Sequence, residues 1–484
     1  MRFLENSSLI GSSGRMLKLF CIFLITVFFV FSQDSLANIG EAYGFGSRIA
    51  SLAGAGVAWG GGAYSAYHNP ALLALESEKK LFFDWSIVYS KPKFKPIQGI
   101  LVQNKFVADS PQYGNVDNDS YRETLGQELG LSYRIFPEIR NITVGLVTFF
   151  PLSQFAYMDT GEAYVPEYVL YRTRTQRPQI ELGLGGYLGK GFYLGVGVHF
   201  AYTLTSNSSI FINSGKSTTS SMRFAASLRP KPGFYSGILY IPEKVLKKFS
   251  IGAVFRQAVA SDNSMNLNSA ARIIGSFPAI DFNFSALSVL YYDPMTIELG
   301  SSWQYSDTGR LYVQLEYQFW SQFQAPSLLI HQPQTKNCGS TDPQSCGTVA
   351  ISPGQIPDFQ YRNLWVPRIG WEYAPADGQI VYRMGYAFRD SFLVGLPTGN
   401  GNYLDPPKHM FNLGIGLNYS HFMGYDAPCR LDFNLSYQYL LTQHIVKTPG
   451  NEVGDPPDDS KIGSPEYFSG GSVYGGGMTL SLGF

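Results

Sequence analysis

Two runs near the end of the sequence, residues 431–439 and 473–484, alternate apolar and polar side chains. In the first run the odd positions hold leucine, phenylalanine or tyrosine, and the even positions hold aspartate, asparagine, serine or glutamine. A period of two predicts strands with one apolar and one polar face. The second run stops on Phe484. We expect it to close a barrel, because a lipid environment tolerates no open sheet edge.

The same alternation recurs along most of the chain and predicts fourteen strands. Short and long connections alternate between them, which is typical of barrels with short periplasmic turns and long external loops. We therefore predict an all-β fold, a 14-stranded antiparallel transmembrane β-barrel whose last strand pairs with its first. The predicted strands are 81–89, 128–136, 140–150, 178–188, 192–205, 222–240, 249–258, 284–306, 311–323, 364–373, 380–389, 409–419, 430–442 and 473–484.

Composition agrees with a barrel. Charged residues make up 15% of the chain and aromatic residues another 15%, whereas a soluble protein carries about 25% charged residues. The formal net charge is zero, so nothing in the composition favours nucleic acid as a partner. A mean hydropathy of −0.05 does not indicate a helical membrane protein. It suits a strand protein whose apolar outer face is diluted by a polar lumen.

The one long apolar run, residues 17–31, precedes the small residues Ser35-Leu36-Ala37. This order predicts a secretory signal peptide over residues 1–37, with Met16 as an alternative start. The run is short for the roughly 20 residues that a spanning helix needs. An N-terminal anchor helix nevertheless stays open as the alternative.

Residues 38–79 are rich in small side chains and have no strand pattern. Such a segment cannot form a core alone but can pack closely against surrounding backbone. We expect it to be a plug inside the barrel, which itself spans residues 80–484 with long external loops. The plug residues singled out are Gly54, Gly56, Asn69, Pro70 and Ala71.

Two segments depart from simple alternation. In the run 140–150 both faces are apolar, with Gly145, Val147 and Phe149 opposite the regular apolar face. These three residues either pack on the plug or line an apolar route through the wall. The loop 261–283 carries more apolar residues than a solvated loop does, which predicts a hydrophobic capture site outside the membrane. Its candidate residues are Ile273, Ile274, Phe277, Ile280 and Phe282.

Charged residues on the predicted lumen face are expected to be a mutually paired lining. Cys338 and Cys346 share one loop and are expected to form a disulfide in an oxidising compartment, with zinc as the alternative for the pair. No histidine flanks them at ligand spacing. The sequence has no catalytic signature and predicts neither an enzyme nor a cofactor or metal site. The lumen residues are Glu128, Arg134, Glu181, Glu298, Glu316, Arg368, Glu372, Arg383 and Asp432.

Several motifs in this order resemble the FadL/TodX family of outer-membrane transporters for hydrophobic compounds. They are Asn69-Pro70-Ala71 after a small-residue stretch, the run Leu299 to Trp320-Ser321, Arg368-Ile-Gly-Trp-Glu-Tyr373, Arg383-Met-Gly-Tyr-Ala-Phe388 and the final strands. The resemblance implies a barrel blocked by a hatch, external capture of a lipophile, and sideways release at the third strand, here 140–150. The acidic pair often found before the N-P-A motif is replaced by Gly62-Ala63-Tyr64, and the loop 207–221 is short and polar.

From these features we predict a monomeric channel in the outer membrane of a Gram-negative-type cell. Its expected partners are outer-membrane lipid and a hydrophobic small molecule such as a long-chain fatty acid or hydrocarbon. Transport is expected to be passive, because the sequence shows no energy source. A plugged-barrel scaffold or secretion component and a general porin are the alternatives.

Overall fold

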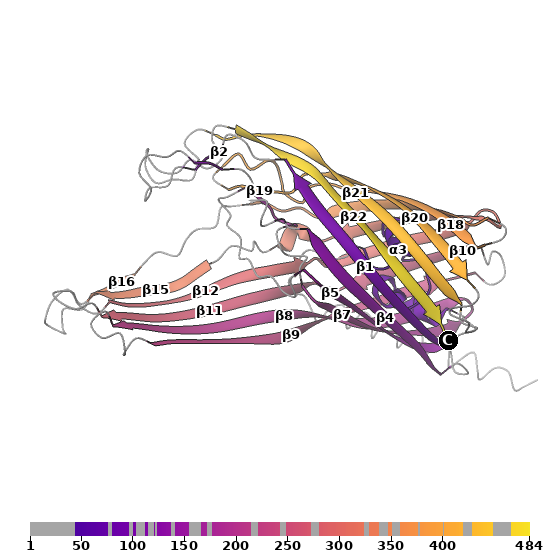
Figure 1. Ribbon diagram of the computed structural model, residues 1–484, viewed down its shortest axis with the longest axis horizontal. Coiled ribbons are helices and arrows are strands. Elements are labelled where there is room, and N and C mark those ends of the chain that lie inside the picture. Colours follow the sequence, from indigo (N-terminus) through magenta and orange to yellow (C-terminus); the bar gives the residue numbers. More distant parts are fainter. Residues whose placement is uncertain are drawn as a thin grey trace, which may run out of the picture.

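The structure is a computed structural model, and Figure 1 shows its course. It describes residues 44–75, 80–95, 100–102, 112–114, 121, 123–136, 141–153, 166–171, 177–213, 221–242, 248–272, 280–323, 329–337, 347–350, 359–375, 378–399, 401–419, 428–448 and 466–484. The predicted signal peptide and the two cysteines of the predicted disulfide lie outside these residues.

Fourteen strands of one sheet form a closed antiparallel ring, as predicted. In ring order the strands are β1 (Leu81–Phe94), β4 (Thr124–Phe136), β5 (Ile142–Pro151), β7 (Gln179–Gly189), β8 (Phe192–Asn213), β9 (Ser221–Tyr240), β10 (Phe249–Arg256), β13 (Thr296–Gln304), β14 (Gly309–Gln318), β17 (Leu364–Tyr373), β18 (Ile380–Arg389), β20 (Lys408–Tyr419), β21 (Cys429–Val446) and β22 (Glu466–Gly483).

The ring closes between the first and the last strand. The register runs without a break from Phe82 opposite Gly483 to Phe94 opposite Gly471, which confirms the predicted partner of the last strand. Outward positions such as Leu435 and Phe433 are exposed, whereas Asp432 and Asn434 of the same strand are buried toward the lumen. The alternation in the sequence thus sorts side chains to the two faces of the wall.

Two ends of the barrel differ in their connections, as the sequence predicts. At the short-turn end the strands are joined within a few residues, for example β7 to β8 through Lys190 and Gly191. At the long-loop end the connections carry the short strands β2 (Ile100–Val102), β3 (Gln112–Gly114), β6 (Glu167–Tyr168) and β19 (Tyr403–Leu404).

The largest difference from the sequence prediction lies at the long-loop end. The segment predicted as loop 261–283 contains most of β11 (Val259–Arg272) and the beginning of β12 (Ile280–Asp293), and much of the predicted loop 207–221 extends β8. With β15 (Leu329–Asn337) and β16 (Gly347–Ala350) they form a sheet outside the ring, in the order β9-β8-β11-β12-β15-β16. Figure 1 shows this outer sheet extending well beyond the barrel.

One smaller correction concerns a proline. The predicted strand 284–306 is two strands, because β12 ends at Asp293 and β13 begins at Thr296 after Pro294. In the predicted strand 222–240, Pro230 and Pro232 do not interrupt β9, which pairs continuously with β8 through both residues. The partner β10 reaches only as far as Tyr235, so the prolines lie on an edge of β9 that pairs with no other described strand, where a missing N–H is tolerated.

The segment 44–75 lies inside the ring. It contains two short helices, α3 (Ser47–Ala50) and α4 (Ser65–His68), and the 3₁₀ helix η1 (Pro70–Ala74). Most of its side chains are buried. Within the described part of the chain, no helix combines the length and apolar character needed to cross a membrane.

Candidate functional site

Asn69 joins the plug to the barrel wall. Its side-chain oxygen accepts a hydrogen bond from Ala71 N–H at 3.0 Å, which caps η1. Its amide nitrogen donates to the carbonyl oxygens of Val57 (2.8 Å) in the plug and Ile238 (3.3 Å) in β9. The side chain is fully buried, and the three contacts link two parts of the plug to one strand of the wall.

Glycines of the wall let the plug backbone approach closely. A Cβ added at Gly195 of β8 would lie 2.2 Å from the carbonyl carbon of Pro70 and 2.3 Å from Ala71 N. At Gly237 of β9 it would lie 2.0 Å from Asn69 Oδ1. These positions tolerate no side chain while the Asn69-Pro70-Ala71 turn is in place.

The two plug glycines singled out in the sequence serve different purposes. Gly54 has a φ of +81°, a conformation that side chains rarely adopt, and it lies next to the Arg368 guanidinium. Gly56 has no such backbone, but a Cβ there would approach Ile49 Cγ2 to 2.7 Å. One glycine is therefore needed for the turn and the other for packing within the plug.

Strands around the whole ring hold the plug by hydrogen bonds from or to its backbone. The donors and acceptors come from β4, β10, β14, β17 and β22 as well as β9, so the plug fills the lumen rather than lying against one side. The contacts are Gly46 N to Glu128 Oε2 (3.0 Å), Ser47 N to Thr479 Oγ1 (2.8 Å), Val57 N to Gln314 Oε1 (3.2 Å), Ser250 Oγ to Ala58 O (2.7 Å) and Arg368 Nη1 to Ala53 O (2.9 Å).

Most of the predicted lumen charges are paired with an opposite charge, as the sequence predicts, and they are largely buried, whereas Glu128 accepts a hydrogen bond from Gly46 N–H of the plug. Arg383 contacts Glu372 at 2.6 Å and Asp432 at 2.7 Å, and Arg48 of the plug contacts Glu372 at 3.3 Å. Elsewhere Arg256 lies 3.6 Å from Glu181 Oε2 and 3.5 Å from a second carboxylate, that of Glu298. Paired charges with so little exposure leave the lumen no open polar channel among the described residues.

His68 of the plug is a buried titratable group. Its Nε2 lies 2.8 Å from Phe45 O, so the neutral ring donates to this carbonyl. Burial lowers the pKa of His68 to about 4, and the positive charges of Arg256 and Arg368 act in the same direction. The plug therefore holds a neutral histidine at neutral pH.

The candidate lateral route in β5 is closed by the plug in this structure. Val147 and Phe149 are fully buried in a cluster with plug residues that include Phe45 and Leu73. A Cβ on Gly145 would meet Leu73 Cδ2 at 2.9 Å. β5 also pairs with β4 and β7 along both edges, so the described wall has no gap here.

The long-loop end carries an aromatic cap that sequence reasoning missed. Trp320 stacks on Phe392 with ring centroids 4.8 Å apart, and Phe359 stacks on Tyr403 at 4.6 Å. Arg389 donates to both carboxylate oxygens of Asp405 at 2.9 Å beside these rings. The cluster draws residues from four separate connections between barrel strands, so no single stretch of sequence shows it. Its buried members include Val169, Leu170, Tyr291, Tyr292, Trp320, Phe323, Leu364, Phe392, Leu393 and Tyr403.

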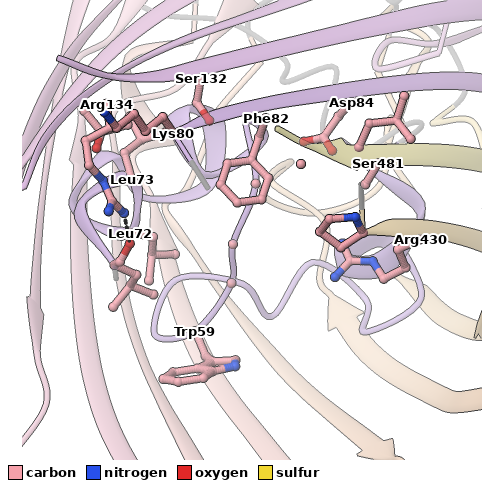
Figure 2. Close-up of a pocket in the computed structure, with 18 of the residues that line it drawn as sticks. Trp59, Leu72, Leu73, Lys80, Phe82, Asp84, Ser132, Arg134, Arg430 and Ser481 are labelled. Atoms are coloured by element: carbon pink, nitrogen blue, oxygen red, sulfur yellow. Dashed lines mark hydrogen bonds between the residues drawn. The ribbon is translucent and has the colours of Figure 1, made fainter. Parts of the chain in front are cut away.

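At the short-turn end a cavity of about 970 Å³ lies beneath the plug. The cavity is lined by Trp59 and Leu72 of the plug and by Tyr193 and Tyr419 of the barrel. Figure 2 shows Lys80 and Arg134 together on one side, with Asp84 and Arg430 on the other. The cavity combines apolar walls with charged residues.

Three of the predicted capture residues, Ile273, Ile274 and Phe277, lie outside the described residues. Ile280 and Phe282 belong to β12, where their register partners in β11 are Ala271 and Ser269. The capture site therefore stays a prediction for all five residues. The disulfide between Cys338 and Cys346 also stays a prediction.

Comparisons with known proteins support one fold. A Pseudomonas aeruginosa FadL homologue has a solved structure that matches 93% of this chain and 99% of its own, with a TM-score of 0.56 and 15% identity. The toluene transporter TodX of P. putida matches 91% of this chain and 98% of its own, with a TM-score of 0.50 and 11% identity. The chain has the FadL/TodX-type fold.

Sequence comparison gives a shorter match. Alkane uptake protein A of Marinobacter nauticus is 27% identical over 211 residues, which are 43% of this chain and 42% of that protein. The chain thus matches less than half the length of this relative. No protein-family model matches the sequence.

The resemblance seen in the sequence is confirmed for the FadL/TodX-type fold. The N-P-A motif forms the cap of η1 at the plug–wall contact, and the Trp-Ser pair after β14 places Trp320 in the aromatic cap. Arg368 and Arg383 lie in β17 and β18 and bind carboxylates in the lumen. The motifs therefore mark contacts between parts of the fold that are distant in sequence.

Proposed function

We propose that this chain is an outer-membrane protein that lets hydrophobic compounds cross the outer membrane passively. The fold supports this proposal because the structural neighbours include a protein named as a toluene transporter. The partial match to a protein named for alkane uptake points to the same class of compounds. Long-chain fatty acids and hydrocarbons are both within the proposed range.

One observation carries the proposal: the lumen of the barrel is filled, and its long-loop end carries both a buried aromatic cluster and exposed apolar side chains. The aromatic cap lies there, and the outer sheet exposes Met222, Phe224 and Leu228 to solvent. Large apolar surfaces that are exposed to water mark binding sites. A general porin would need an open polar lumen, whereas the plug occupies the described lumen.

We also propose β5 as the place of lateral release, next to Val147 and Phe149. These side chains lie between the plug and the wall, so an apolar molecule could reach the bilayer here once the plug moves. The motion must take Leu73 away from Gly145, because the two are in close contact.

Uptake by whole cells tests the proposal. Two cultures of cells with a lipopolysaccharide outer membrane would be compared, one that expresses the full chain and one that does not. The rates at which the cells take up pyrene and a fluorescent fatty acid would be measured. We expect the chain to accelerate uptake of at least one probe severalfold, with no change for a polar sugar. Equal rates with and without the chain would refute the proposal.

A disulfide between plug and wall tests the lateral release. Cβ atoms at Val57 and Gly300 would lie 3.4 Å apart, close to the spacing in disulfides, so Val57→Cys with Gly300→Cys should lock the plug. The lock is expected to stop fatty-acid uptake, and a reductant should restore it. Unchanged uptake in the oxidised protein would exclude a route that depends on plug motion.

A further inference from the structure

The outer face of β9 is apolar along its length except at Ser236. Every even-numbered residue from 222 to 240 is uncharged. The odd-numbered residues of the outer half include Arg223, Arg229 and Lys231. We call the other even-numbered residues, without Ser236, the β9 stripe: Met222, Phe224, Ala226, Leu228, Pro230, Pro232, Phe234, Ile238 and Tyr240.

The stripe starts in the barrel wall and continues into the outer sheet without changing faces. β9 pairs with β8 from Tyr240 to Ser221 with no register shift, so its alternation is never inverted. Phe234 and Ile238 are 48% and 43% exposed on the outside of the barrel. Met222 and Phe224, farther out on the same face, are 69% and 61% exposed.

Neighbouring strands widen the stripe. Leu204 and Ile210 of β8 are the register partners of Leu228 and Met222. Ser206 and Ser208 lie between them and are nearly fully buried. Their parallel partners in β11 are Met265 and Leu267, so the polar hydroxyls are surrounded by larger apolar residues. The result is an apolar surface several strands wide.

The β9 stripe is longer than the part of a barrel strand that contacts the lipid hydrocarbon. A strand rises about 3.3 Å per residue, so the 20 residues of β9 span roughly 66 Å, whereas the apolar band of an outer-membrane barrel is about 25 Å tall. Because barrel strands are tilted, one crosses this band in about 10 residues, so about half of β9 lies beyond the hydrocarbon region. Its apolar face bridges the polar headgroup layer on the outside of the wall.

The lumen is a poor route for a molecule without any polar group. It would pass the ion pairs of Arg256 with Glu181 and Glu298, and the contact of Arg177 with Asp293. These charged groups gain nothing from contact with a hydrocarbon and resist loss of their partners. The β9 stripe contains no charged residue that a hydrocarbon must pass.

We propose that the β9 stripe carries wholly nonpolar molecules, such as alkanes and simple aromatic hydrocarbons, from the medium to the bilayer along the outside of the barrel. This second route rests on the proposed function and adds to it a pathway that bypasses plug and lumen. The occupant is nonpolar because the stripe is continuous with the lipid-facing surface and offers no partner for a head group.

Whole-cell uptake of pyrene tests the stripe. The variant combines Met222→Ser, Phe224→Ser and Leu228→Ser, and the control replaces Arg223 and Arg229 with Ser on the opposite face of the same strand. We expect the chain-dependent rate of pyrene uptake to fall at least fivefold in the stripe variant. In the control variant it should stay within twofold of the wild-type rate. The plug lock between residues 57 and 300 should leave pyrene uptake within twofold.

The outcomes separate the stripe from the proposed function. Pyrene uptake that survives in the stripe variant, or that stops in the locked plug, overturns the stripe. If the chain accelerates neither pyrene nor the fatty acid, the proposed function fails and the stripe fails with it. If the wild type is a dimer, the stripe variant is a monomer and the two take up pyrene at the same rate, the surface serves self-association and the stripe proposal is overturned. Heat-dependent mobility in detergent gels verifies that each variant is folded.

Discussion

At the scale of single residues, the plug depends on a few side chains that each join distant segments. Asn69 is the clearest example, since it bonds to η1, to Val57 and to β9 from a fully buried position. A buried hydrogen bond contributes about 1 kcal/mol, and an unpaired buried partner costs more. The motif containing Asn69 was visible in the sequence, but its partners Val57 and Ile238 were not, because nothing local connects them.

Asn69→Ala should weaken the docking of the plug by on the order of 2–3 kcal/mol, because three hydrogen bonds are lost at once. Amide hydrogen exchange of residues 44–75 in detergent-solubilised protein would measure the change. Asn266→Ala, which removes an exposed hydrogen bond to Asn207, serves as the control. Equal exchange rates in wild type and Asn69→Ala would show that packing alone holds the plug.

His68 should make plug docking depend on pH. The pKa of His68 falls from its ordinary value of about 6.5 to about 4 in the folded plug, so the released form binds a proton more readily. The contribution of the neutral ring is fully present above pH 6.5 and is lost as the pH falls toward 4. The maximum effect is about 3 kcal/mol, from the shift and 1.36 kcal/mol per pKa unit.

Limited proteolysis of the plug at pH 7 and pH 5 measures this effect. Wild type should be cut faster at pH 5, and His68→Gln, which keeps a donor for Phe45 O but cannot titrate, should lose the difference. A His68→Gln plug that remains as sensitive to acid as wild type would assign the effect to other groups.

At the scale of elements, the barrel strands were predictable and the outer sheet was not. Alternation placed Phe433 outside and Asp432 inside because each barrel strand separates two different environments. The sequence of the outer half of β8 predicts a polar loop, because Ser206 and Ser208 stand at positions where alternation would place apolar residues. Only pairing with β9 and β11 shows that larger apolar residues surround them. Pairing between distant strands is thus the information that the local pattern lacks.

Gly195→Ala tests the contact between wall and plug at this scale. The added Cβ would lie 2.2 Å from the Pro70 carbonyl carbon, and backbone on both sides leaves little room for adjustment. We expect η1 to be displaced, with faster hydrogen exchange in residues 65–75. Gly61→Ala is the matched control in the plug, because its Cβ would meet nothing within 4 Å. Protection of η1 that matches the control would contradict the close approach.

At the scale of the whole molecule, the structure places apolar and charged regions in a fixed order. From the long-loop end inward lie the aromatic cap, the paired lumen charges with the plug, and the cavity of about 970 Å³. The ring itself closes by pairing of β1 with β22 and does not need the plug for its strand hydrogen bonds. Plug and barrel are therefore separable in principle, although the plug fills the lumen.

Deletion of residues 44–75 tests whether the barrel forms without the plug. The deleted protein should still insert as a barrel, because every wall strand keeps both neighbours. The lumen charges that now contact the plug, such as Glu128 and Arg368, would become hydrated and line an aqueous path. We expect single-channel conductance in planar bilayers to rise from near zero to a measurable steady level, and to fall again at low pH as lumen carboxylates are neutralised. Wild-type and deleted protein with the same conductance, both shown to be folded, would mean that the aromatic cap closes the barrel without help from the plug.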